Sequence, residues 1–239
     1  MKDIYKDLTF ISIAYNNEEE LIDTVCSYEN CLNHGATSIV INGGSKFKHQ
    51  SFHENILLVE EKDEGIFDAL NKGVSLVKTK YLILIHSGDT FSGDTEYLEN
   101  LLFRMESEEL DLILGNQIIP FKKIKRKHSS NLWHPFFLNF GAQPPHMPTI
   151  YKKEFIKNIK YDITNKVIAD FFYFNDIFNE KPKWSNYTKS LIEMGPGGNT
   201  TNGFSSFLLV SKEFIKNYGV FKGSLIAIFR IPFKFIQMY

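Results

Sequence analysis

The sequence predicts an α/β fold: a Rossmann-type, mostly parallel sheet flanked by helices, followed by a helical appendage. Short apolar runs of strand length recur through the first half of the chain, and stretches with helical periodicity separate them. This alternation is typical of parallel strands joined by right-handed crossovers. The 239 residues suit one large domain with a small addition. We therefore expect a main domain over residues 1–202 and an amphipathic helical appendage over residues 203–239.

The first third of the chain supplies three of the expected strands, at residues 8–15, 38–41 and 56–59. Asn17 and Glu20 have the spacing of a capping box, which predicts the start of a helix that runs to Leu32. The second strand ends at Asn42-Gly43-Gly44. This tripeptide is either a simple turn or the edge of a binding site.

Residues 61–89 are the stretch around which the rest is organised. Its middle carries one apolar helix face, made by Ile66, Ala69, Leu70, Gly73, Val74 and Val77. A buried strand follows at residues 81–85 and stops at the turn His86-Ser87-Gly88-Asp89. Ligands of open α/β sheets bind beyond the carboxyl ends of the strands. Asp89 is therefore a candidate oxygen ligand of a divalent cation, the alternative being a helix-capping residue.

The pattern EKDEGIFDALNKG, a buried strand and then HSGD resembles the family 2 glycosyltransferases with a GT-A fold. It is closest to the branch that reads roughly E-x-D-x-G-I-Y-D-A-M-N-K-G before a strand ending in N-S-G-D. The match is dense in the first half of the chain and thin in the second. It implies a GT-A-like fold and an inverting transferase that uses a nucleotide-diphosphate sugar, with UDP as the expected nucleotide.

The resemblance also implies a donor site and a metal. The donor-binding residues it suggests are Tyr15, Asn42, Asp63, Asn71, Lys72, Ser87, Gly88 and His146. Asn42 stands where the family usually has Asp, so it keeps an acceptor but lacks the charge that would hold a uracil imide N–H. Asp89 is the expected ligand of Mn²⁺ or Mg²⁺. Ser87 occupies the first acidic position of the family's D-x-D motif, which leaves one carboxylate fewer.

The second half contributes two shorter motifs. PPHMPTIYKKEF resembles the family's P-H-Q stretch, with Met147 in place of Gln, so His146 is expected at the donor diphosphate, the metal or the acceptor. Ala169-Asp170-Phe171 resembles the family's A-D-Y motif, which makes Asp170 the expected catalytic base. The alternatives are a structural His146 and an Asp170 that only stabilises a helix N-terminus. Residues 194–201 resemble a Gly-rich loop that closes over donor phosphates.

Periodicity predicts the remaining elements of this half. They are a helix over residues 95–105 capped by Asp94, a strand over 111–119, a solvated basic hairpin at 122–127, an irregular segment over 133–149 on the acceptor side, and a helix over 166–179. In the tail, Lys212, Lys216, Lys222, Arg230 and Lys234 alternate with Phe and Ile. This composition favours helices lying in an anionic membrane interface, the alternative being packing on the domain or on a second subunit in an oligomer.

Composition limits the possible partners and location. A formal net charge of −1 argues against nucleic acid as a partner. Two cysteines without metal spacing, no secretory signal and no uncharged run of about 18 apolar residues predict a cytoplasmic protein, peripheral at the inner face of the plasma membrane. The family resemblance implies a saccharide acceptor joined to a lipid diphosphate, in bacterial O-antigen, capsule or exopolysaccharide synthesis. A nucleotidyltransferase and an inactive membrane-associated binding protein of the same fold are the alternatives.

Overall fold

The computed structural model describes residues 4–48, 52–91, 94–121, 124–195 and 204–236. The strands within these ranges are β1 (Leu8–Ala14), β2 (Thr37–Asn42), β3 (Ile56–Glu60), β4 (Tyr81–Leu84), β5 (Thr90–Phe91), β6 (Leu112–Phe121), β7 (Ile124–His128), β8 (Ile150–Lys152) and β9 (Trp184–Glu193). The helices are η1 (Ile4–Asp7), α1 (Glu18–Ser27), α2 (Glu29–Asn33), α3 (Ile66–Leu76), α4 (Thr95–Ser107), η2 (Pro135–Phe140), α5 (Lys153–Ile156), α6 (Ala169–Asn179), α7 (Phe204–Tyr218) and α8 (Val220–Ile236).

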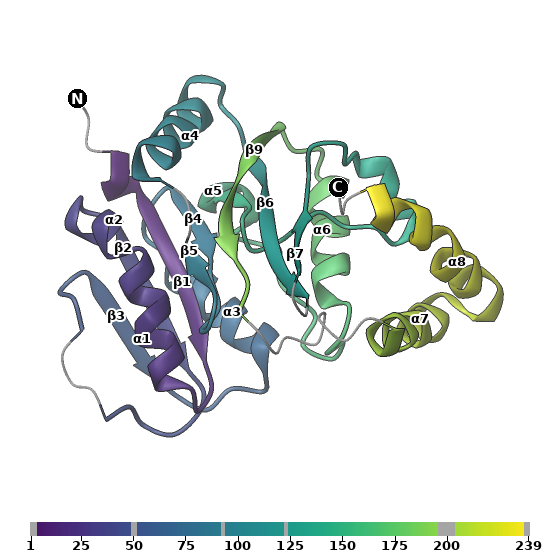
Figure 1. The fold of residues 1–239 in the computed structure, drawn as a ribbon, viewed down its shortest axis with the longest axis horizontal. Helices are drawn as coiled ribbons and strands as arrows, with labels where there is room; N and C mark the ends of the chain where they lie inside the picture. Colours follow the sequence, from purple (N-terminus) through teal and green to yellow (C-terminus); the bar gives the residue numbers. More distant parts are fainter. Residues whose placement is uncertain (1–3, 49–51, 92–93, 122–123, 196–203, 237–239) are drawn as a thin grey trace.

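One curled sheet runs through the molecule in the order β3-β2-β1-β4-β8-β6-β9-β5, with β7 paired to β6 (Figure 1). The half built from β3, β2, β1 and β4 is parallel throughout, as the sequence predicts. Beyond β4, antiparallel strands join it, and only β6 and β9 pair in parallel. The carboxyl ends of the four parallel strands therefore lie along one edge.

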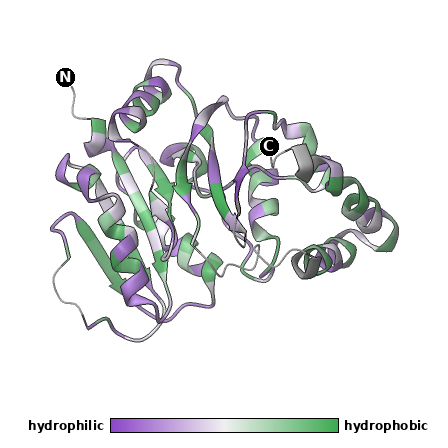
Figure 2. Ribbon diagram, viewed as in Figure 1, coloured by the Kyte–Doolittle hydropathy of each residue, from purple (hydrophilic) through white to green (hydrophobic). Residues whose placement is uncertain are grey.

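Helices cover both faces of strand β1. Tyr28, between α1 and α2, stacks on Phe10, and its hydroxyl hydrogen-bonds to Ser12 at 3.1 Å. On the opposite face Gly73 of α3 lies against Ile11, where a Cβ atom would come within 2.5 Å of that side chain. The closeness explains the glycine inside a helix, where it otherwise costs stability. Figure 2 shows the apolar character of the enclosed strands.

Several local predictions are confirmed or corrected. Asp94 caps α4 through a hydrogen bond from the Tyr97 amide, and residues 124–127 of the basic run lie in β7, which pairs antiparallel with β6. The capping box is wrong: the Asn17 side chain accepts from the Tyr15 amide instead. The helix expected to reach Leu32 is broken at Tyr28 into α1 and α2. Strands β8 and β9 were not predicted.

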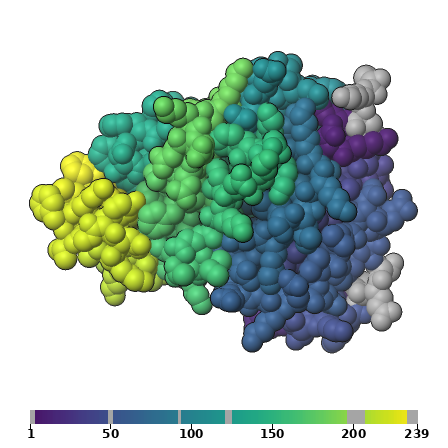
Figure 3. All heavy atoms as spheres, turned by 180° about the vertical axis from the view of Figure 1, so that it is seen from behind, coloured from purple at the N-terminus to yellow at the C-terminus, as the bar shows by residue number. Residues whose placement is uncertain are grey.

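Helices α7 and α8 form a lobe at one end of the molecule, beside η2 and α6 (Figure 1; yellow in Figure 3). Gly219, at φ +79°, reverses the chain between them. The helices pack tightly, since a Cβ atom on Gly223 would lie 2.4 Å from the Ile215 Cα. Phe214 is buried edge-on against Phe171 of α6, with ring centroids 5.0 Å apart. These contacts join the predicted appendage to the main domain.

Candidate active site

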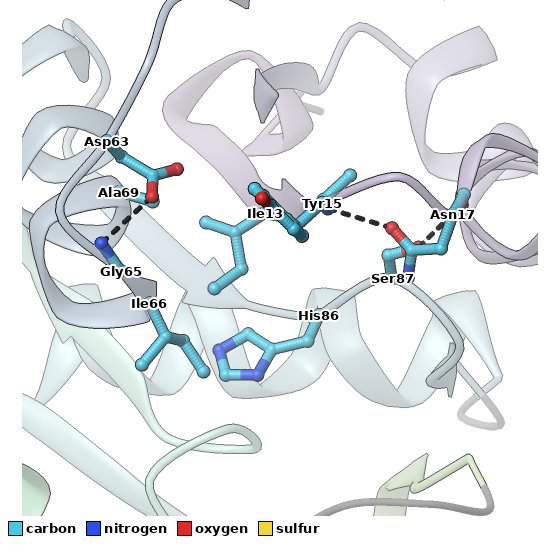
Figure 4. A pocket seen from close by; sticks show the side chains of 10 residues that line it. Ile13, Tyr15, Asn17, Asp63, Gly65, Ile66, Ala69, His86 and Ser87 are labelled. Carbon is cyan, nitrogen blue, oxygen red and sulfur yellow. Dashed lines mark hydrogen bonds between the residues drawn. The ribbon is translucent and has the colours of Figure 1, made fainter. Parts of the chain in front are cut away.

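A cavity of about 530 Å³ opens beyond the carboxyl ends of β1 and β4. It is lined by Ile13, Ala14, Tyr15, Asn17, Asp63, Gly65, Ile66, Ala69, His86 and Ser87. Figure 4 shows Ile13 and His86 between the Asp63–Gly65 turn on one side and the Asn17–Ser87 pair on the other. The position is the one where open α/β sheets bind ligands.

The turn before α3 forms one wall of this cavity. The Gly65 amide donates to the Asp63 carboxylate at 2.9 Å. Gly65 has φ +122°, a conformation that favours glycine. Asp63 also packs on Gly43 so closely that a Cβ atom there would overlap its carboxylate. The end of β2 and the start of α3 therefore fix Asp63 at the cavity.

The turn after β4 forms the opposite wall. The Ser87 amide donates to the carbonyl of Ile13, at the end of β1, at 3.1 Å. The Ser87 hydroxyl donates to the Asn17 carbonyl at 3.2 Å. Gly88 has φ +93°, and its amide donates to the Thr24 hydroxyl. Tyr15, at the end of β1, is exposed and free to cover a ligand. Tyr15, Asp63 and Ser87 thus meet at one cavity.

Asp89 lies just behind this turn, with 6% of its surface exposed. Its carboxylate accepts a hydrogen bond of 2.9 Å from the Gly195 amide, which follows β9. Burial raises the Asp89 pKa from 3.8 to about 6, and hydrogen bonds from backbone amides partly offset the rise. The family resemblance places Gly195 in a loop expected near the donor phosphates. It did not predict the bond to Asp89, because a contact between the β4 turn and the end of β9 has no local signal.

Three of the predicted donor residues make internal contacts instead. Asn42 is fully buried, and its amide nitrogen donates to the Ser45 carbonyl at 2.8 Å. Asn71 exchanges two hydrogen bonds of 2.9 Å with the Tyr161 backbone. Lys72 pairs with Glu61 at 3.0 Å and with Asp68 at 3.3 Å. The structure does not bring these three to the cavity lining, and their donor roles stay predictions.

A histidine pair connects the cavity to the second half of the chain. The His86 and His146 rings have centroids 5.8 Å apart, and the Nε2 atom of each is buried without a hydrogen-bond partner. Burial lowers the pKa of both, that of His86 to about 3, so both are neutral at pH 7. His86 was missed, although it stands where the family pattern has Asn.

Asp170 lies beyond His146, in the first turn of α6. The Gln143 side-chain amide donates to one carboxylate oxygen, and the Phe171 amide donates to the other at 3.0 Å. The carboxylate is close enough to His146 to raise the pKa of that imidazole, against the larger effect of burial. The half-buried Asp170 therefore faces the same region as the histidine pair.

The donor set allows a limited role for a metal. Among the described residues, no group of three His, Cys, Asp or Glu side chains could hold an ion. Magnesium is nevertheless often bound by one or two carboxylates together with substrate phosphates. Asp89 fits that arrangement as the single protein carboxylate, with the remaining ligands coming from a phosphorylated substrate and water.

The parallel half-sheet, the cavity at its carboxyl edge and the buried aspartate behind it define an α/β protein that binds its ligand at the carboxyl ends of its strands. A comparison with family profiles matches residues 9–182 to "Glycosyl transferase family 2". The chain belongs to this family. The predictions of a GT-A-like fold and of a glycosyltransferase-family enzyme are confirmed at that level.

Two curated relatives come from bacterial glycan pathways. The PGL/p-HBAD biosynthesis glycosyltransferase of Mycobacterium tuberculosis is 23% identical over 168 residues, which are 68% of this chain and 61% of that protein. The minor teichoic acid biosynthesis protein GgaB of Bacillus subtilis is 26% identical over 205 residues, which are 74% of this chain and 22% of GgaB. The chain thus spans only part of each relative.

Solved structures confirm the fold. S. aureus TarS superposes with a TM-score of 0.61 at 13% identity, over 87% of this chain and 40% of TarS. A TarS fragment has been solved with UDP, at a TM-score of 0.58. The mannosyltransferase PcManGT of Pyrobaculum calidifontis, in complex with GDP-Man and Mn²⁺, gives a TM-score of 0.59 at 12% identity, over 97% of this chain and 72% of that protein.

Proposed function

We propose that this protein transfers a sugar, with inversion, from a nucleotide-diphosphate sugar to a hydroxyl of a saccharide acceptor in the synthesis of a bacterial surface glycan. One observation carries the proposal: the family's donor cavity and its predicted base are joined by the buried His86–His146 pair. UDP is favoured because the similar TarS fragment was solved with it, and PcManGT, solved with GDP-Man, makes guanosine the alternative.

In this proposal, the residues in and around the cavity have separate roles in donor binding and in catalysis. Tyr15 covers the nucleotide, Asp63 accepts from its base or ribose, and the turn at Ser87 and Gly88 faces the diphosphate. Asp89 would hold Mn²⁺ or Mg²⁺, which supplies positive charge to the departing diphosphate. The neutral His146 borders the site where donor and acceptor meet. Asp170 takes the proton of the acceptor hydroxyl as that oxygen attacks the anomeric carbon.

The direct test is slow donor hydrolysis. The purified protein is incubated with UDP-GlcNAc, UDP-glucose, UDP-galactose and GDP-mannose in the presence of Mn²⁺, and released nucleotide diphosphate is measured. We expect one donor to be hydrolysed well above the others, because a site that hydrogen-bonds its substrate rejects analogues that leave its polar groups unpaired. Binding without any product would identify an inactive binding protein, and release of pyrophosphate from a nucleotide triphosphate and a sugar phosphate would identify a nucleotidyltransferase.

We also propose that helices α7 and α8 attach the protein to an anionic membrane surface, where a lipid-diphosphate-linked acceptor would be found. Their described surface exposes large apolar side chains, among them Leu208, Leu209, Val220, Phe221, Leu225, Ile228 and Phe229. Lysines lie beside them, and each basic group near an anionic leaflet contributes on the order of 1 kcal/mol. Within the described part of the chain, no helix is both long and apolar enough to cross a bilayer.

Liposome sedimentation tests this attachment. Phe221 and Val220 are 82% and 75% exposed, so replacing both with serine leaves the packing intact. Burying one such side chain contributes roughly 1.5–3 kcal/mol, so we expect the double variant to bind vesicles containing phosphatidylglycerol at least tenfold more weakly. Leu132→Ser, at a site 72% exposed outside these helices, is the matched control. Equal binding by the double variant and the control would contradict the membrane proposal.

A further inference from the structure

Helix α8 contacts the segment that leads from η2 to Gln143. The Arg230 Nε donates to the Gly141 carbonyl at 3.0 Å. Gly141 ends η2 at φ +69°, and a Cβ atom there would lie 2.8 Å from Ile226 and 2.9 Å from Phe214. Arg230 is half-buried, whereas its neighbour Phe229 is exposed. The arginine therefore lies on the inward side of α8, together with Ile226 and Ala227, which are buried.

The same segment holds the carboxylate of Asp170. Gln143, two residues after Gly141, donates a hydrogen bond to it. The Ala142 carbonyl between them accepts from the Trp133 indole at 2.8 Å, and the Ala142 amide donates to the Phe137 carbonyl at 3.1 Å. Movement of α8 would therefore be transmitted through three consecutive residues to Asp170.

The charges around Asp170 single out Arg230. Among the described groups whose pKa is shifted, those that interact with its charge are His146, Tyr151, Tyr161 and Arg230. Burial keeps the imidazole neutral by lowering its pKa and keeps both phenols neutral by raising theirs. Of these groups, Arg230 alone is positively charged at neutral pH, and its guanidinium and the Asp170 carboxylate attract each other.

We propose that Arg230 is a positioning residue for Asp170, so that helices α7 and α8 complete the acceptor side of the active site. The inference rests on the proposed role of Asp170 as base. A base must be held in line with the acceptor hydroxyl, and a displacement of about 1 Å can lower the rate roughly 100-fold. Removing the helices would accordingly impair chemistry as well as any membrane attachment.

Arg230→Gln tests this role on the full-length protein, with the donor that the panel identifies. We expect kcat for hydrolysis to fall roughly 10- to 100-fold with the donor KM unchanged. Arg230→Lys keeps the charge and a donor at this position and should recover part of kcat. A variant with kcat within threefold of wild type would overturn the proposal.

The matched control is Arg104→Gln. Arg104 of α4 also donates to a backbone carbonyl, that of Asn186 at 3.2 Å, but the carboxylate it pairs with is Glu108, at 2.7 Å. A purely structural role of Arg230 would lower the rate further even when the Asp170 carboxylate is absent. In an Asp170→Asn background, Arg230→Gln should cause no further loss, since Arg230 acts through that carboxylate.

Hydrogen exchange separates this inference from the proposed function, because it needs no donor. The Ala142 and Phe171 amides are both hydrogen-bonded, and we expect them to exchange faster in Arg230→Gln but not in Arg104→Gln. If the wild-type protein turns over no nucleotide sugar, the proposed function is overturned. Faster exchange in Arg230→Gln would then still support the coupling between Arg230 and the Asp170 segment. Unchanged exchange in such an inactive protein would overturn both.

Discussion

Replacing Asp170 with asparagine is expected to lower kcat roughly 10²–10⁴-fold, the range for losing a general base. The change is nearly isosteric, and Gln143 and the Phe171 amide can still donate to the remaining side-chain oxygen. Donor affinity should therefore change little, since Asp170 lies outside the lining of the nucleotide cavity. Initial rates and calorimetric titration of the nucleotide, on the same preparation, measure the two effects separately.

Asp176→Asn is the control for that experiment. Asp176 is an exposed carboxylate on the same helix α6, so its replacement removes equal charge without touching the site. We expect activity close to that of wild type. An Asp170→Asn enzyme that also stays within about threefold of wild type would leave Asp170 as a residue that stabilises the helix N-terminus.

The parallel half of the fold could be predicted because its signals are local. Each strand from β1 to β4 is a short apolar run, and the stripe of α3 matches one helix face. Strands β8 and β9 could not be found in this way. β8 has only three residues, and β9 alternates irregularly between buried and exposed positions because its register against β6 shifts near Asn116.

The site was predictable only in part, for a related reason. Tyr15, Asp63 and Ser87 follow strand ends, and parallel pairing brings such positions together. Asn42 and Asn71 belong to motifs that the family resemblance assigns to donor binding in the same way. Their side chains nevertheless hydrogen-bond to the backbone of Ser45 and of Tyr161. Which of two similar amides faces a ligand depends on neighbours distant in sequence.

The tail shows the same limit. Its composition predicts amphipathic helices, and helices α7 and α8 are present where they were expected. The direction in which Arg230 points could not be read from the sequence, since it lies between Phe229 and Ile231 just as Lys234 lies between two phenylalanines. The predicted boundary at residues 202 and 203 stays a prediction, and the Gly-rich stretch from 196 to 201 lies outside the described residues.

Asp89→Asn is expected to abolish transfer and to weaken metal-dependent donor binding. Asp89 is the carboxylate proposed to hold Mn²⁺ or Mg²⁺, and a neutral amide is a poor ligand for such cations. The fold should survive, because an amide oxygen can still accept from the Gly195 amide. Calorimetry with the donor nucleotide, with and without Mn²⁺, measures the binding loss. Wild-type activity in excess chelator equal to that with Mn²⁺ would remove the metal assignment.

The same variant should raise thermal stability at neutral pH. The Asp89 pKa is raised from 3.8 to about 6, so folding favours the protonated form. The ionised carboxylate therefore lowers the free energy of unfolding. Each pKa unit corresponds to about 1.4 kcal/mol, so the loss of stability is on the order of 3 kcal/mol above pH 6. The loss vanishes below about pH 4, where Asp89 is protonated in both the folded and the unfolded protein.

Melting curves of Asp89→Asn and wild type at pH 7.5 and pH 4 measure this difference. We expect a higher Tm for the variant at pH 7.5 and nearly equal values at pH 4, because only the ionised carboxylate is penalised by burial. Asp162→Asn is the control of opposite sign: hydrogen bonds from Thr164 lower the Asp162 pKa, so that change should not stabilise the protein at pH 7.5. A gain for Asp89→Asn of the same size at both pH values would show that burial of the ionised carboxylate is not its cause.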